Sequence, residues 1–189
     1  ETEGKKKVCV VGGGVGCAIA YPVLKKFHDC GAEVHAVVGF KNKDVVILED
    51  KFKSASDVMK LVTDDGSYGE KAFTTQKLEE LIQKGEKFDE IVAVGPPIMM
   101  KLVCEIAAKY NIPSVASLTA YMIDGTGMCG GCRCMIGGED KFVCGDGPEF
   151  DGSLVDWDDL LKRSNYYKDQ EAEDRAHVCR LTGGVRYHD

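Results

Sequence analysis

Short apolar runs alternate with amphipathic stretches through the first 118 residues of the chain. A run of consecutive apolar side chains is typical of a strand that is covered on both faces. Such runs predict strands at 7–11, 33–40, 44–48, 58–63, 90–95 and 114–117. Amphipathic or capped stretches between them predict helices at 17–30, 49–56, 74–85 and 97–110. The regular alternation predicts an α/β fold built on a doubly wound parallel sheet.

The pattern changes after residue 118. Residues 119–150 are rich in glycine and cysteine, and they lack the apolar runs that a core of their own would need. The next stretch, 154–163, predicts one amphipathic helix with an apolar face made by Leu154, Trp157, Leu160 and Leu161. From Lys168 onward the tail is polar and charged, typical of a docking extension or a frayed end. The predicted division is a nucleotide-binding domain (1–118), a metal-binding subdomain (119–150), and a C-terminal helix with its tail (151–189).

Composition narrows the class of partner. The 189 residues are 44% hydrophobic, which is ordinary for a globular protein, and their net charge is −7. An acidic chain is a poor ligand for nucleic acid or an anionic membrane, both of which attract basic surfaces. No apolar stretch approaches the roughly 20 residues of a membrane span, and the N-terminal residues do not form a signal peptide. These features predict a cytoplasmic protein.

A glycine loop follows the first predicted strand, in the sequence VVGGGVGCA. Gly12, Gly13, Gly14, Val15 and Gly16 place backbone N–H groups and a helix N-terminus where a pyrophosphate could bind. A strand-to-helix turn without a ligand would need similar residues, so the motif alone is a weak signal. The second strand also departs from the common dinucleotide pattern, because it ends without an acidic residue for the ribose hydroxyls. Lys41 and Lys43 would instead favour a phosphate on that ribose.

Two further corners belong to the same predicted edge of the sheet. The first, TDDGSYG, contains Asp65 and Gly66, and the second, VGPPIMM, contains Gly95, Pro96 and Met99. Ligands of doubly wound sheets bind at the carboxyl ends of the strands, where all three loops should meet. Together they predict a crevice for NAD(H) or NADP(H).

Nine cysteines in a chain without an export signal indicate buried thiols and metal ligation rather than disulfides. Most of the scattered ones lie in apolar segments and are expected to be small core side chains. The scattered cysteines are Cys9, Cys17, Cys30, Cys104 and Cys179.

The four clustered cysteines allow two ligand sets. Cys129, Cys132, Cys134 and Cys144 form an all-thiolate set that would suit structural zinc. Asp124, Cys129, Cys132 and Cys144 instead follow the plant-type [2Fe–2S] spacing, with a carboxylate in place of the first thiolate. A zinc ribbon would need a second C-x-x-C knuckle, which is absent, so the spacing favours the cluster. Cys132 and Cys134 are two residues apart and should point to opposite sides of an extended chain, which makes Cys134 a bystander.

The order of these motifs, GGGVG, TDDGSYG, GPPIMM, MIDGTGMCGGC and DGPEFD, resembles the iron–sulfur flavoprotein subunits of the ferredoxin reductase superfamily. That family includes the electron-transfer subunit of dihydroorotate dehydrogenase. The chain resembles more closely the small subunits of NADH-dependent ferredoxin:NADP oxidoreductases, which are also described as sulfide dehydrogenase subunits. In that group an aspartate at the position of Asp124 ligates the cluster. The resemblance covers nearly all of residues 5–168.

The resemblance implies electron flow from a nicotinamide nucleotide through FAD to a [2Fe–2S] cluster and on to a partner. The partner would be a larger flavin and iron–sulfur subunit in a hetero-oligomer, with ferredoxin as a further acceptor. It also implies an N-terminal flavin barrel, but no RxYS-type flavin motif occurs in the 189 residues. The flavin domain is therefore expected outside this chain, and no catalytic side chain is assigned because the cofactors carry the chemistry. A nucleotide-responsive binding module with a structural zinc is the alternative hypothesis.

Overall fold

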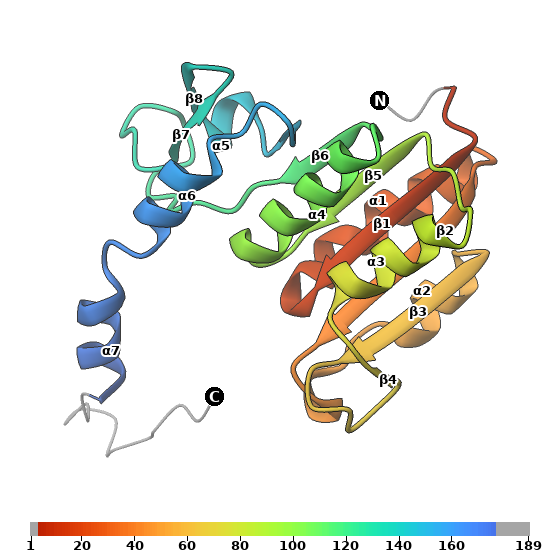
Figure 1. Ribbon diagram of the computed structural model, residues 1–189. Coiled ribbons are helices and arrows are strands. Elements are labelled where there is room, and N and C mark those ends of the chain that lie inside the picture. The colour runs from red at the N-terminus through yellow and green to blue at the C-terminus, as the bar shows by residue number, and fades with distance from the viewer. Residues whose placement is uncertain (1–3, 177–189) are drawn as a thin grey trace.

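A seven-stranded sheet forms the centre of the molecule in the computed structural model, which describes residues 4–176 (Figure 1). Its strands run in the order β4-β3-β2-β1-β5-β6-β9, and all neighbouring pairs are parallel except β6 and β9. The prediction of a doubly wound α/β sheet is confirmed. The bounds are β1 Lys7–Gly13, β2 Glu33–Phe40, β3 Val58–Thr63, β4 Glu70–Lys71, β5 Glu90–Val94, β6 Ser114–Ser117 and β9 Glu149–Asp151.

Helices cover both faces of this sheet and divide the core into two layers. Val8 and Val10 of β1 pack with α1 (Cys17–Asp29) and α2 (Glu49–Ser54). Cys9 and Val11, which alternate with them, pack instead with α3 (Thr74–Gln83) and α4 (Pro97–Lys109). Successive side chains of a strand point to opposite faces, so one continuous apolar run supplies both layers.

The strand predicted at 44–48 is wrong. A short 3₁₀ helix, Lys43–Val45, occupies this stretch, and Val45 and Ile47 are largely exposed. The Asn42 side chain accepts a hydrogen bond from the backbone N–H of Asp44. This local bond occupies an N–H group that a strand would pair with a neighbouring strand. The place beside β2 is taken by β3, which pairs with it over six residues.

The C-terminal part folds onto the α3–α4 side of the sheet. It contains a two-stranded hairpin, a short helix and two further helices, and its buried side chains join the core around α4. The predicted helix at 154–163 begins later, because Asp156 caps it by accepting from the N–H of Asp159. Leu154 therefore precedes the helix and is exposed, contrary to its predicted place on the apolar face. The bounds are β7 Arg133–Ile136, β8 Glu139–Phe142, α5 Val143–Asp146, α6 Trp157–Ser164 and α7 Lys168–Ala176.

The scattered cysteines differ in how far they are buried. Cys9, Cys17 and Cys104 are buried in the core, as predicted, whereas Cys30 is exposed. Burial raises the pKa of the Cys104 thiol to about 11, so this thiol stays protonated at neutral pH. Cys179 and the end of the predicted tail lie outside the described residues. Within residues 4–176, no helix has both the length and the apolar character that crossing a bilayer requires.

Candidate functional site

A pocket of about 470 Å³ lies at the carboxyl edge of the sheet, where the glycine loop was expected to meet the other two corners. The ends of β1 and β2, the turn after β3, and the N-termini of α3 and α4 form its walls. Most of the lining is apolar, with Lys41 and Asp64 as its charged groups. The pocket is lined by Gly13, Gly14, Gly39, Phe40, Lys41, Asp64, Phe73, Thr74, Thr75, Pro96, Ile98, Met99 and Leu102.

The glycines of the first loop have two separate roles. A Cβ on Gly16 would lie 2.8 Å from the carbonyl oxygen of Val94, so glycine is needed there for close packing of two loops. Gly14 has a φ of +55° and nothing within 4 Å of a Cβ built on it, so this position faces open space. Gly14 is therefore the glycine whose missing side chain leaves room for a ligand.

The structure sorts the predicted nucleotide residues into three groups. Gly13, Gly14, Pro96 and Met99 line the pocket. The glycines at 12, 16 and 95 are not in the lining and have close neighbours instead: Gly12 lies against helix α1, and Gly16 and Gly95 lie against each other. Outside the lining are Val15, which is 83% exposed, and Asp65 and Gly66, which belong to the turn beyond it.

Asp65 instead accepts a hydrogen bond from the N–H of Ser67, and the neighbouring Asp64 lines the pocket. Sequence reasoning missed Asp64, Gly39 and the N-terminus of α3. The available signal was their position: Asp64 directly follows β3, Gly39 is the next-to-last residue of β2, and Thr74 begins α3. Gly39 is needed because a Cβ there would collide with Thr74 Cγ2.

The loop with the clustered cysteines is wound by glycines in the left-handed region at 125, 127 and 130. The carboxylate of Asp124 accepts two hydrogen bonds from backbone N–H groups of this loop. Its Oδ1 accepts from the N–H of Thr126 and its Oδ2 from the N–H of Cys129, each at 2.9 Å. These amides, Thr126 first, lower the pKa of Asp124 below its ordinary value. Each carboxylate oxygen keeps a second lone pair, so Asp124 remains able to bind a metal while it holds Cys129 beside it.

Cys132 and Cys144 converge although they are far apart in sequence. Their Sγ atoms are 3.2 Å apart, too long for a disulfide bond of about 2.05 Å. Thiolates on one tetrahedral metal, with bonds of about 2.3 Å, lie about 3.8 Å apart, so this pair is close to the separation that a shared metal requires. Backbone N–H groups also point at two of the sulfurs, from Cys144 to Cys132 Sγ and from Gly131 to Cys129 Sγ, each at 3.4 Å.

Cys134 lies apart from this group. Its thiol is buried in the core beside the hairpin and donates a long contact, 3.6 Å, to the carbonyl oxygen of Lys141. Burial raises the pKa of Cys134 to about 11, which disfavours the thiolate that a metal would need. Cys134, Cys132 and Ile136 all belong to the core cluster around α4, but in the described residues the sulfurs of Cys132, Cys134 and Cys144 do not all lie within 4.8 Å of one another.

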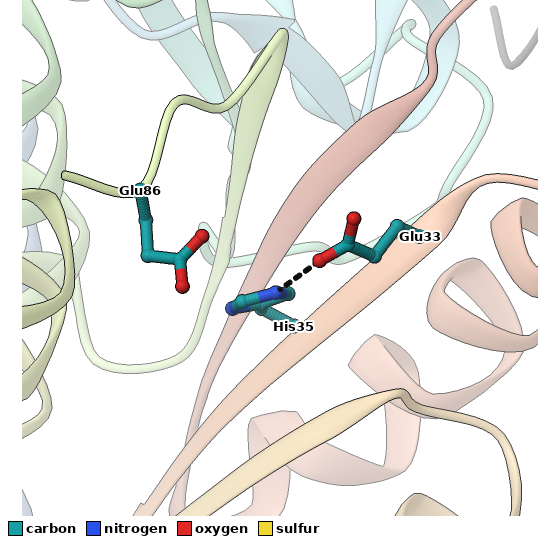
Figure 2. A group of neighbouring side chains, drawn as sticks. All are labelled: Glu33, His35 and Glu86. Atoms are coloured by element: carbon teal, nitrogen blue, oxygen red, sulfur yellow. Dashed lines mark hydrogen bonds and ion pairs between the residues drawn. The ribbon is translucent and has the colours of Figure 1, made fainter.

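A second group of metal-type ligands lies at the opposite edge of the sheet (Figure 2). Glu33, His35 and Glu86 are, among residues 4–176, the only three such side chains whose ligand atoms all lie within 4.8 Å of one another. Lys7 already provides their cation, since its Nζ is 2.7 Å from Glu33 and 2.5 Å from Glu86. This group is therefore an ion-pair network at this edge of the sheet, and it requires no metal.

Comparisons with known proteins agree with this geometry. Residues 119–156 match the family model of the iron-sulfur cluster binding domain of dihydroorotate dehydrogenase B. The dihydroorotate dehydrogenase B (NAD(+)) electron transfer subunit homolog of Thermotoga maritima is 48% identical over 171 residues, covering 90% of this chain and 60% of the relative. The probable electron transfer subunit of the same enzyme in Methanocaldococcus jannaschii is 42% identical, covering 82% and 57%.

A solved structure is similar as well. It is described as the NADH-dependent reduced ferredoxin-NADP oxidoreductase, studied for flavin-based electron bifurcation. One of its chains superposes with a TM-score of 0.80 and 45% identity, covering 89% of this chain and 60% of that one.

The fold and the cysteine loop thus define a ferredoxin-reductase-type nucleotide domain joined to an iron–sulfur binding segment. The resemblance predicted from the motifs is confirmed: this chain is a relative of the electron-transfer subunits of oxidoreductases of the dihydroorotate dehydrogenase B type. It spans 57% to 60% of the length of the relatives compared here.

Proposed function

We propose that the chain is an electron-transfer module of an oxidoreductase. It would bind NAD(P)H in the pocket at the carboxyl edge of the sheet and hold a [2Fe–2S] cluster in the cysteine loop. A flavin outside this chain, FAD by resemblance, would connect the two sites, and a larger partner subunit would receive the electrons, with ferredoxin as a further acceptor. The observation that carries this proposal is the convergence of Cys132 and Cys144 within the segment that matches an iron–sulfur binding domain.

The ligands of the proposed cluster would be Asp124, Cys129, Cys132 and Cys144. They form two pairs: Asp124 is bonded to the backbone of Cys129, and Cys132 contacts Cys144. Two pairs suit a centre with two irons, each of which takes two protein ligands. When bound, such a cluster supplies one-electron redox chemistry, and the N–H groups that point at the sulfurs tune its potential.

A structural zinc is less well supported. A tetrahedral zinc needs all of its thiolates around one point, whereas no three of the candidate ligands lie mutually within 4.8 Å in the described part of the chain. The fourth thiolate of the zinc set would be Cys134, which is buried and whose thiol contacts the carbonyl oxygen of Lys141.

The pocket offers groups for both halves of a nicotinamide nucleotide. Gly14 leaves space beside the N-terminus of α1 for a pyrophosphate, and Pro96 and Met99 provide an apolar wall for the nicotinamide ring. Asp64 would repel a phosphate on the adenosine ribose and Lys41 would attract one. The names of the relatives contain NAD(+), which favours the reading that Asp64 dominates.

Anaerobic purification with metal and sulfide analysis tests the proposal. A red-brown protein that contains iron and acid-labile sulfide in equal amounts, together with saturable NADH binding, is the expected result. A colourless protein that contains zinc would overturn it and support a nucleotide-responsive module instead.

A further inference from the structure

One wall of the nucleotide pocket is made by residues 64–73, here called the 64–73 loop. It begins at Asp64 directly after β3, passes through β4, and ends at Phe73, the N-cap of α3. Asp64 and Phe73 both line the pocket, so the two ends of the loop carry this wall. The position of the loop therefore determines the shape of the pocket.

Local hydrogen bonds shape the turn of the loop. Thr63 Oγ1 donates to the carbonyl oxygen of Tyr68 at 2.6 Å and accepts from its N–H at 3.2 Å. The Tyr68 hydroxyl donates to Glu49 at 2.9 Å, and a Cβ on Gly69 would lie 2.5 Å from the carbonyl oxygen of Leu61. These contacts attach the loop to β3 and α2, on the side away from α3.

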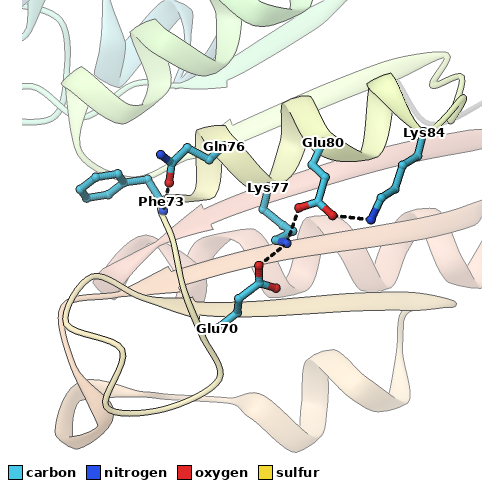
Figure 3. Close-up of polar contacts among 6 residues, drawn as sticks. All are labelled: Glu70, Phe73, Gln76, Lys77, Glu80 and Lys84. Carbon is cyan, nitrogen blue, oxygen red and sulfur yellow. Dashed lines mark hydrogen bonds and ion pairs between the residues drawn. The ribbon is translucent and has the colours of Figure 1, made fainter.

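Two side chains of α3 attach to the loop: Gln76 accepts a hydrogen bond from the N–H of Phe73 at 2.9 Å, where the loop joins the helix, and Lys77 reaches back to β4. Lys77 lies on the first turns of the helix, and its Nζ donates to Glu70 of β4 at 2.6 Å and to Glu80 at 2.5 Å (Figure 3). Glu80 also pairs with Lys84, which extends from the same helix without reaching the loop. The Lys77 side chain is only 6% exposed, against 66% for Lys84.

The Lys77 side chain is covered, but its partners are not: the side chains of Glu70 and Glu80 are 57% and 41% exposed. An ion pair with exposed carboxylates adds little stability, so this one is better explained by the arrangement of the loop that it selects. The carboxylates, Glu70 first and then Glu80, raise the pKa of Lys77 above 10.5. Lys77 therefore keeps its charge below pH 10.5 and loses it only when the pH rises through the raised pKa.

We propose that Lys77 is a positioning residue for nucleotide binding: by pairing with Glu70 it holds the 64–73 loop against α3, with Asp64 and Phe73 in place on the pocket wall. This inference rests on the proposed nucleotide pocket. Lys77 itself does not line the pocket and would not contact the nucleotide. Its effect would pass through the loop alone.

Lys77→Met tests this role, because it removes the charge but keeps the length of the side chain. We expect the Kd for NADH to rise about tenfold, while the unfolding temperature and the visible spectrum stay unchanged. Lys84→Met is the matched control, since it also removes a partner of Glu80, and it should bind NADH as the parent does. Glu70→Gln should reproduce the loss, and the double variant Lys77→Met/Glu70→Gln should be no worse than either single variant.

Equal NADH affinity of Lys77→Met and the parent would overturn the inference, and so would a lowered unfolding temperature without any change in Kd. Hydrogen exchange separates this failure from that of the pocket itself. If the parent binds no NADH, the proposed pocket is wrong. Hydrogen exchange of the backbone amides of the 64–73 loop then tests whether Lys77 positions the loop. If it does, these amides should exchange faster in Lys77→Met than in Lys84→Met; if it does not, they should exchange equally fast in both variants.

Discussion

Two side chains of the cysteine loop, Asp124 and Cys134, distinguish the two ligand sets that the sequence allows. Asp124 is exposed and accepts hydrogen bonds from the backbone N–H groups of Thr126 and Cys129, whereas Cys134 is buried with its thiol at a raised pKa. An exposed carboxylate on a glycine-wound loop can reach a metal without unfolding the core. Cys134 instead lies within the β7–β8 hairpin, where its thiol contacts the carbonyl oxygen of Lys141.

Substitutions at these two positions should therefore have opposite effects. Cys134→Ser should keep the iron and the EPR signal of the reduced cluster. Asp124→Ala should lose or destabilise the cluster, and Asp124→Cys should give the spectrum of a four-cysteine cluster, because a thiolate is a softer and more covalent donor. Iron analysis and EPR of the three variants check this. Loss of iron from Cys134→Ser, with Asp124→Ala unchanged, would contradict the choice of Asp124.

Gly14 is the residue on which nucleotide binding should depend most directly. Gly14→Val should abolish measurable binding of NADH and NADPH while the cluster stays intact, because its side chain would enter the pocket at a φ of +55°. Gly31→Val is the matched control: it introduces the same kind of strain at a φ of +84°, also into open space but outside the pocket. Titrations that show undiminished binding in Gly14→Val would mean that the pyrophosphate lies elsewhere.

At the scale of elements, periodicity predicted the parallel sheet and its four covering helices, because each buried strand is a continuous apolar run. It failed where an apolar run was short and its backbone groups had local partners, as at 44–48. It also gave no sign of β9, whose Phe150 pairs with Ala116 across a long sequence separation. Of the residues predicted for the nucleotide, only some line the pocket, since loop motifs show which glycines turn the chain but not which of them face the pocket.

β9 attaches the cysteine loop to the sheet, and Gly152 at its end allows close packing against α4. A Cβ on Gly152 would collide with Cys104 Sγ and lie 2.7 Å from Ser114 Oγ. Gly152→Ala should therefore destabilise the protein by about 1–3 kcal/mol, as overpacking of a core does. Denaturant unfolding measures this. Gly145→Ala, whose Cβ would have nothing within 4 Å, should unfold like the parent, and equal stability of both variants would contradict the packing argument.

At the scale of the whole molecule, the proposed function requires the nucleotide pocket and the cysteine loop to exchange electrons that NADH would deliver as a two-electron hydride. A cluster accepts single electrons, so a flavin is needed to convert one process into the other. NADH alone should therefore leave the cluster of the isolated chain oxidised, and added flavin-bearing partner protein should allow its visible absorbance to bleach. Rapid bleaching by NADH without any flavin present would show that the proposed electron path is wrong.

Mössbauer spectroscopy of the ⁵⁷Fe-enriched, oxidised chain tests the central claim most directly. If Asp124 and Cys129 bind one iron while Cys132 and Cys144 bind the other, the two irons differ in their ligands. The spectrum should then contain two doublets of equal area, the one from the carboxylate-bound iron having the higher isomer shift, and Asp124→Cys should bring the two doublets together. A single doublet in the parent chain, or zinc in place of iron, would contradict a [2Fe–2S] cluster held by one aspartate and three cysteines.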